Sequence, residues 1–79
     1  MEEDAVGILV EMLKAEKESD LRRMIVRVLG ETGSDDAVPV LEKLAVDDSD
    51  KRIRLEAVDA LEEIDSPKAR AALVRIINK

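Results

Sequence analysis

A repeat at every 32 positions constrains the fold of this chain more than any other feature. Leu9, Leu41 and Leu73 stand 32 positions apart, and the same offset relates many other similar residues. These sets are Ala5, Ala37 and Ala69; Met12, Leu44 and Ile76; Leu21 and Ile53; Arg22 and Arg54; Leu29 and Leu61; Ser34 and Ser66. Because the similarity covers whole units, it indicates an array of stacked repeats. Such arrays offer binding surfaces more often than catalytic sites, so the period favours a binding protein and leaves its partner open.

Within each unit, the apolar residues recur at helical spacing. Segments 21–32 and 53–64 follow the order i, i+4, i+7, i+8 and i+11, which predicts two amphipathic helices, here called A helices. Segments 4–15, 36–46 and 67–78 share a second pattern, A-x-x-x-L-x-x-[MLI], which predicts three B helices. The sequence therefore predicts an all-α fold of about five helices in the order B, A, B, A, B.

The repeat boundaries follow from this order. We expect one domain over residues 1–79, with half a repeat at 1–17 and full repeats at 18–48 and 49–79. The turn residues support these boundaries. Ser66 can cap a helix, and the proline that follows it suits the first turn of that helix.

Two further turns connect the predicted helices. Segment 47–50 supplies acidic caps for the second A helix, and segment 30–33 has the glycines of a helix exit. Pro39 has no N–H group and must lie in the first turn of its helix. We therefore expect Asp35 or Asp36, and not Ser34, to cap the helix over 36–46.

The repeat unit resembles the short HEAT-like repeats of the phycobilin-lyase type, whose pattern is D-x-x-V-R-x-x-A-x-x-x-L-G-x-I-G-x-x-x-A-x-x-x-L-x-x-L. The residues of the last unit that match it are Asp50, Ile53, Arg54, Ala57, Leu61, Ile64, Ala69, Leu73 and Ile76. Departures include Glu18 for Asp, Ile25 for Ala, and Glu62 and Asp65 where the family prefers Gly. The resemblance implies a short right-handed α-α solenoid that holds other macromolecules. Some family members assist chromophore attachment or handle nucleic acids, but no motif here carries those activities over.

Composition narrows the function further. The chain has no Cys, His or aromatic residue, so disulfides and the usual zinc and haem ligands are absent, and we expect no cofactor. A net charge of −6 disfavours binding to nucleic acids and anionic membranes. The acidic start at residues 1–4 and the lack of an apolar run of about 20 residues predict a soluble, cytoplasmic protein. Abundant Glu, Lys and Arg with no Gln are typical of thermophilic proteins and equally of engineered repeats.

Two charged clusters are candidate sites. Basic residues gather at the starts of the A helices, namely Arg22, Arg23, Arg27, Lys51, Arg52 and Arg54. They form either a stripe for phosphate or acidic peptides, or a ladder of ion pairs between repeats with Asp20, Asp48, Asp50 and Glu56, which we favour. The adjacent pairs Glu62 and Glu63, and Asp35 and Asp36, point about 100° apart on a helix. They cannot converge for acid–base catalysis, so we expect no enzyme.

The B helices carry the preferred binding surface. Their apolar residues beside the A-x-x-x-L stripe are too many to be buried in so small a stack, and charged neighbours flank them. The candidate protein-binding residues are Val6, Val10, Val38, Glu42, Lys43, Val46, Arg70, Val74, Arg75 and Ile77. The alternative is that the apolar members pack within a wide buried face. Met12 shares the register of Leu44 and Ile76, which predicts a core position, whereas Met24 stays open.

The ends of the array are a second candidate. No helix shields the first B helix or the segment 72–77, and the polar residues that partly cap these ends are Glu2, Glu3, Arg70 and Arg75. Either a second copy of the chain covers an open end or the B helices, or the chain is a piece of a longer array. The sequence therefore predicts a non-catalytic scaffold that binds a protein partner or a second copy of itself, without a small-molecule substrate. The alternatives are a nucleic-acid-binding module or an accessory subunit of a lyase-type enzyme.

Overall fold

The computed structural model describes residues 4–79, and this part of the chain forms five α-helices, one 3-10 turn and no strand. In chain order the elements are α1 (Ala5–Ala15), α2 (Ser19–Glu31), the 3-10 turn η1 (Asp35–Ala37), α3 (Val38–Asp47), α4 (Lys51–Ile64) and α5 (Pro67–Ile77). The predicted all-α class and the order of the helices are confirmed. The predicted cap residues Glu2 and Glu3 lie outside the described residues.

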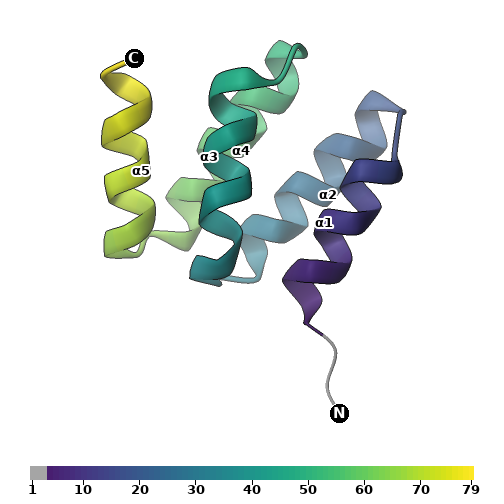
Figure 1. Cartoon of the computed structure of the whole chain (residues 1–79), viewed down its shortest axis with the longest axis horizontal. Helices are drawn as coiled ribbons and strands as arrows, with labels where there is room; N and C mark the ends of the chain where they lie inside the picture. The colour runs from purple at the N-terminus through teal and green to yellow at the C-terminus, as the bar shows by residue number, and fades with distance from the viewer. Residues whose placement is uncertain (1–3) are drawn as a thin grey trace.

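The helices lie in two layers. Figure 1 shows α1, α3 and α5 side by side in front, with α2 and α4 behind them and running in the opposite sense. The Cα atoms extend over 36 × 29 × 15 Å, and the thin dimension matches two layers of helices. Each element packs mainly against its neighbours in the array, as in a short α-α solenoid. Within residues 4–79, no helix is long and apolar enough to cross a membrane.

Polar side chains fix the starts of the helices. Asp4 accepts a hydrogen bond from the N–H of Val6, and Asp50 accepts one from that of Arg52, at 3.1 and 2.9 Å. Ser66 caps α5 by accepting from the N–H of Ala69 at 3.0 Å, as predicted. These bonds satisfy amide groups that have no partner within the first turn.

The start of α3 differs from its prediction. Ser34, and not Asp35 or Asp36, is the capping residue: its hydroxyl caps η1 by accepting from the N–H of Asp36 at 3.1 Å, and α3 follows after Ala37 without a side-chain cap of its own. The reason is that a 3-10 turn precedes α3, so the cap lies one turn earlier than a single continuous helix requires. Pro39 then falls in the first turn of α3, where its missing N–H leaves no bond unmade.

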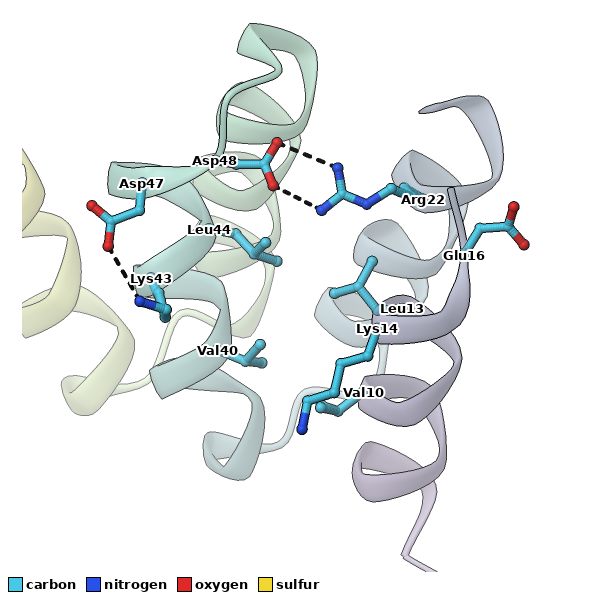
Figure 2. A pocket seen from close by; sticks show the side chains of 10 residues that line it. All are labelled: Val10, Leu13, Lys14, Glu16, Arg22, Val40, Lys43, Leu44, Asp47 and Asp48. Carbon is cyan, nitrogen blue, oxygen red and sulfur yellow. Dashed lines mark hydrogen bonds and ion pairs between the residues drawn. The ribbon is translucent and has the colours of Figure 1, made fainter. Parts of the chain in front are cut away.

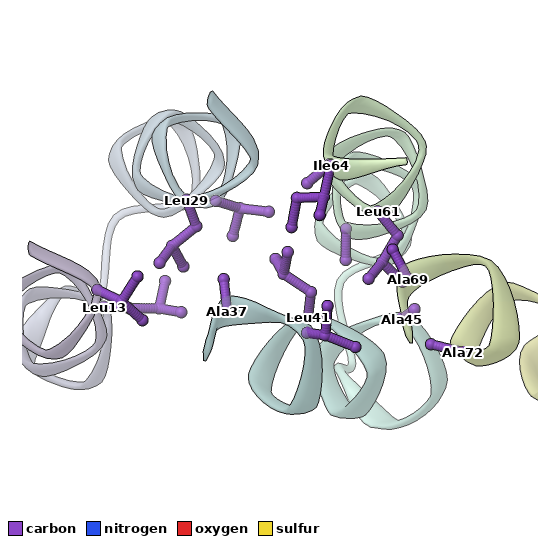
Figure 3. Close-up of a cluster of buried hydrophobic side chains, with 14 of the residues drawn as sticks. Leu13, Leu29, Ala37, Leu41, Ala45, Leu61, Ile64, Ala69 and Ala72 are labelled. Carbon is purple, nitrogen blue, oxygen red and sulfur yellow. The ribbon is translucent and has the colours of Figure 1, made fainter. Parts of the chain in front are cut away.

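The core lies between the two layers (Figure 3). The largest fully buried side chains come from α2, α3 and α4: Val26, Leu29, Val38, Leu41, Ile53 and Leu61. Alanines fill the space toward α5, where Ala69 and Ala72 are also fully buried. The prediction that Ala72 is unshielded is therefore wrong, because α5 packs directly against α3. The core prediction for Met12 is also wrong, since this residue is 50% exposed.

Candidate interaction groove

A groove separates α1 from α3. Its cavity has a volume of about 390 Å³. Figure 2 shows the residues that line it, from both helices and from the start of α2. They are Val10, Leu13, Lys14, Glu16, Arg22, Val40, Lys43, Leu44, Asp47 and Asp48. Apolar side chains thus form the two walls, and charged groups of both signs surround them.

The groove between α1 and α3 exists because bulky side chains occupy positions where the equivalent helix pair, α3 and α5, has alanines. Leu13 of α1 and Val40 of α3 line the groove. The residues 32 positions later are Ala45 of α3 and Ala72 of α5, which Figure 3 shows close to each other. Helices approach more closely when small residues lie at their contact. This agrees with the direct packing of α3 on α5, whereas α1 is held chiefly by α2.

An ion pair closes one end of the groove. Arg22 donates from Nη2 to Oδ1 of Asp48 at 2.7 Å and from Nη1 to Oδ2 at 3.4 Å. Oδ2 of Asp48 also accepts from the N–H of Asp50 at 3.0 Å. The hydrogen bond to Arg22 lowers the pKa of Asp48 below its ordinary value, and the same bond raises the pKa of Arg22. Both side chains are largely buried, so the pair links α2 to the end of α3 with limited screening by solvent.

We expect the fold to lose stability in acid only below about pH 4. The pKa of Asp48 is lowered by Arg22, and that of Glu42 by hydrogen bonding to Arg75. A lowered pKa means that folding favours the ionised form. Each of these two carboxylates therefore contributes fully to the free energy of unfolding above its ordinary pKa. The contribution disappears as the pH falls through the lowered pKa. The chain has no His that would titrate near neutrality.

Urea unfolding followed by circular dichroism at several pH values from 3 to 7 measures this dependence. Asp48→Asn should flatten the acid limb of the profile, whereas Asp47→Asn, at a more exposed carboxylate, should leave it unchanged. A fall in stability of the native sequence between pH 7 and pH 5 would contradict the assignment to these carboxylates.

Two lysines stand at the mouth of the groove. Nζ of Lys43 lies 3.5 Å from Oδ2 of Asp47, and Nζ of Lys14 lies 3.6 Å from Oε2 of Glu11. Both lysine side chains are mostly exposed, so these pairs within single helices contribute little to stability. The ammonium groups can therefore turn toward a bound molecule at small cost.

The arginine-rich helix starts form the predicted ladder between repeats. Arg23 and Arg27 of α2 lie 3.8 and 3.5 Å from the carboxylate of Glu56 on α4. Arg52 lies 3.8 Å from Asp20 and donates to the hydroxyl of Ser19 at 2.7 Å. These contacts confirm ion pairing between repeats, and the pair of Arg22 with Asp48 joins α2 to the end of α3 within one repeat.

Arg54 departs from the ladder prediction. Its Nη1 donates to the backbone carbonyl oxygens of Asp48 and Ser49 at 2.8 and 3.3 Å, and not to a carboxylate. Arg54 thereby holds the turn before α4 and does not link one repeat to the next.

The predicted contact residues fall into several groups. Val10 and Lys43 line the groove. Val6 and Val38 are only 7% and 1% exposed. The prediction that they belong to a contact surface is therefore wrong, and both are core residues. They are buried because their side chains point between the layers. Lys14, an unpredicted residue, joins Val10 on the groove side of α1.

The remaining predicted residues lie toward α5. Glu42 of α3 accepts two hydrogen bonds of 2.8 Å from Arg75 and so fastens α5 to α3. Val46 lines a shallow hollow beside Glu42. Arg70 donates to Asp65 and holds the start of its own helix. The other two predicted contact residues, Val74 and Ile77, are 56% and 79% exposed and do not line the groove.

Sequence reasoning missed the groove walls at Leu13, Val40 and Leu44. The signal was present in the repeat itself, because the bulky pair Leu13 and Val40 corresponds to Ala45 and Ala72. Among the described residues, no group of three or more Asp, Glu, His or Cys side chains is placed to hold a metal ion.

These features define a helical repeat protein, a short solenoid with a groove between two helices of one layer. A family model for HEAT repeats matches residues 5–79, and the chain therefore belongs to the HEAT repeat family. No curated protein and no solved structure matches the chain. HEAT repeats generally serve as non-catalytic scaffolds for protein interactions.

Proposed function

We propose that this chain is a non-catalytic interaction scaffold whose α1–α3 groove holds a short apolar segment of a partner protein. The observation that carries the proposal is the pair of apolar walls, with Val10 and Leu13 on α1 facing Val40 and Leu44 on α3. A volume of about 390 Å³ has room for a few side chains and lies in the range of small binding pockets. Side chains buried there gain about 25 cal/mol for each Å² of apolar surface removed from water.

The charges around the groove define the class of partner. Three basic and three acidic residues line it: Lys14, Arg22 and Lys43, and Glu16, Asp47 and Asp48. The balance of charge favours a segment with low net charge and apolar side chains at helical spacing, which is the helix-in-groove mode of recognition. It disfavours nucleic acid, because Arg22 is already engaged by Asp48 and the whole chain is acidic.

Panning a display library of peptides of about 12 residues against the purified protein tests this proposal. Enriched peptides should carry apolar residues at i, i+3 or i+4, and i+7. Val10→Glu places a carboxylate between the apolar walls and should weaken their binding by at least about tenfold. Leu55→Glu is the matched control, since Leu55 is an exposed apolar residue of α4 outside the groove.

Circular dichroism confirms that both variants fold before binding is compared. Loss of binding with Val10→Glu alone supports the groove as the site. Equal binding to both variants, or enrichment of strongly charged peptides without apolar spacing, overturns the proposal.

A further inference from the structure

One end of the solenoid carries a concentration of exposed apolar side chains. The residues are Ile8 and Met12 of α1 and Leu21, Met24 and Val28 of α2, and together they are called the end face. Their exposed fractions range from 36% to 55%. They are five of the eight large apolar side chains that are exposed within the described residues, so exposure is not scattered evenly over the molecule.

These residues point away from the rest of the solenoid. On α2, Gly30 lies against Ala60 of α4, and Leu21 and Val28 stand about 180° and 200° around the helix from Gly30. On α1, Val10 lines the groove toward α3, and Ile8 and Met12 each lie two positions away, about 200° around the helix. Because α1 and α2 pack as antiparallel neighbours, the two sets form one surface.

The repeat shows that this surface suits a helical neighbour. Leu21 and Val28 correspond, 32 positions later, to Ile53 and Ala60, which are 0% and 4% exposed. Those positions on α4 are covered because α2 and α3 pack against it. Within residues 4–79, no helix covers the end face, although the positions equivalent to Leu21 and Val28 are buried further along the array.

We propose that a second copy of this chain covers the end face across a two-fold axis, with α2 antiparallel to α2 of the partner and Met24 near the axis. The two α1–α2 hairpins then form a four-helix bundle with an apolar centre. This surface is separate from the α1–α3 groove, and the inference does not depend on what the groove binds.

Charge complementarity on α2 carries the choice of a second copy. Asp20 precedes Met24 by four residues and Arg27 follows it by three. An antiparallel pairing centred on Met24 therefore sets Asp20 of each copy beside the partner's Arg27. A two-fold interface requires a surface that complements itself, and this arrangement of charges meets the requirement. A parallel pairing would set Asp20 against the partner's Asp20.

The two charged side chains beside the end face, Asp20 and Arg27, are free to change partners. The side chains of Asp20 and Arg27 are 76% and 57% exposed. Their contacts within the chain are loose, at 3.8 Å from Asp20 to Arg52 and 3.5 Å from Arg27 to Glu56. By comparison, the close pairs Arg22 with Asp48 and Arg75 with Glu42 measure 2.7 and 2.8 Å. Pairing across the interface therefore does not break a close bond within the chain.

The other end of the solenoid is less suited to self-association. The remaining exposed large apolar residues of the described chain are Leu55 on α4 and Val74 and Ile77 on α5. These three exposed apolar side chains offer a partner less apolar surface than the five of the end face, and a standard interface buries about 800 Å² of each subunit.

Sedimentation velocity of the full chain with interference optics tests the proposal, since the protein has no Trp or Tyr to absorb near 280 nm. We expect a dimer at micromolar concentrations. Met24→Glu brings two carboxylates together at the axis and should raise the dimer dissociation constant at least about 100-fold. Two variants serve as controls: Val74→Glu changes α5 at the other end of the solenoid, and Val10→Glu changes the α1–α3 groove. Both proteins should remain dimeric.

A charge exchange tests the antiparallel arrangement. Asp20→Arg alone should weaken the dimer by about tenfold, and the double variant Asp20→Arg with Arg27→Asp should restore it, because opposite charges again meet across the axis. Two results overturn the proposal: a monomer at concentrations up to about 0.5 mM, or a Met24→Glu variant that is folded by circular dichroism and still dimeric. A dimer in which the double variant is weaker than Asp20→Arg overturns the antiparallel pairing.

Discussion

Replacing Leu61 with alanine is expected to lower the free energy of unfolding by about 2–5 kcal/mol. Leu61 is fully buried on α4, the helix that contacts α2, α3 and α5. Truncation removes apolar contacts and leaves a cavity that three neighbouring helices cannot easily close. Small domains have a total stability of about 5–15 kcal/mol, and this chain has 79 residues, so the loss is a large share.

Urea unfolding monitored by circular dichroism at 222 nm measures this loss. Val74→Ala removes apolar atoms from a side chain that is mostly exposed, and it should change the free energy of unfolding by less than about 0.5 kcal/mol. If Leu61→Ala and Val74→Ala had similar effects, the packing of α4 at the centre of the solenoid would be wrong.

The helices themselves could be predicted because their signals are local. The spacing of apolar residues within α2 and α4 fixes one buried face on each helix, and the offset of 32 positions repeats that face along the chain. Ser66 could be predicted as a cap for the same reason, since it bonds to an amide three residues away. The class of fold and the order of the helices depend only on such local patterns.

Burial could not be predicted equally well, because it depends on neighbours. Met12 has the same register as Leu44 and Ile76, and both of these pack against the core. Met12 is exposed because no helix within the described residues lies on its outer side. A period identifies equivalent positions, but equivalent positions at an end and inside an array have different surroundings.

The groove could be predicted only by comparing side-chain sizes at equivalent positions of different repeats. The periodic apolar pattern alone does not contain this information. Leu13 and Val40 each fit the apolar pattern, so each reads as an ordinary core residue. The groove appears only when this pair is compared with Ala45 and Ala72, because the difference in side-chain size changes the distance between two helices. Repeats that differ in size at facing positions are therefore informative about binding surfaces.

Gly30 has a packing role that the local signal did not indicate, although segment 30–33 does form the predicted helix exit. A glycine near the end of a helical pattern is typical of a helix exit. In the structure α2 continues through Glu31, and Gly33 takes the left-handed conformation with φ of 66°. Gly30 is instead buried against α4, where a Cβ atom would lie 2.8 Å from both Cα and Cβ of Ala60. The absence of a side chain permits the close approach of the two A helices.

Gly30→Ala is therefore expected to destabilise the fold by about 1–3 kcal/mol, through overpacking. Helix propensity alone predicts the opposite sign, a gain of about 1 kcal/mol for alanine over glycine. The steric effect should prevail because the added atom meets the backbone Cα of Ala60, which no side-chain rotation can move. Relief requires α2 and α4 to separate, which weakens the contacts of Val26 and Leu29 in the core.

Gly7→Ala is the matched control, because Gly7 is also a helical glycine. A Cβ atom there would lie 3.2 Å from Oδ2 of Asp4, an exposed carboxylate that caps α1 through its other oxygen and can shift slightly. This variant should gain stability by up to about 1 kcal/mol. Ala60→Gly in the Gly30→Ala background should recover only part of the loss, since Cα of residue 60 remains. If Gly30→Ala gained stability as Gly7→Ala does, close packing of α2 on α4 would be refuted.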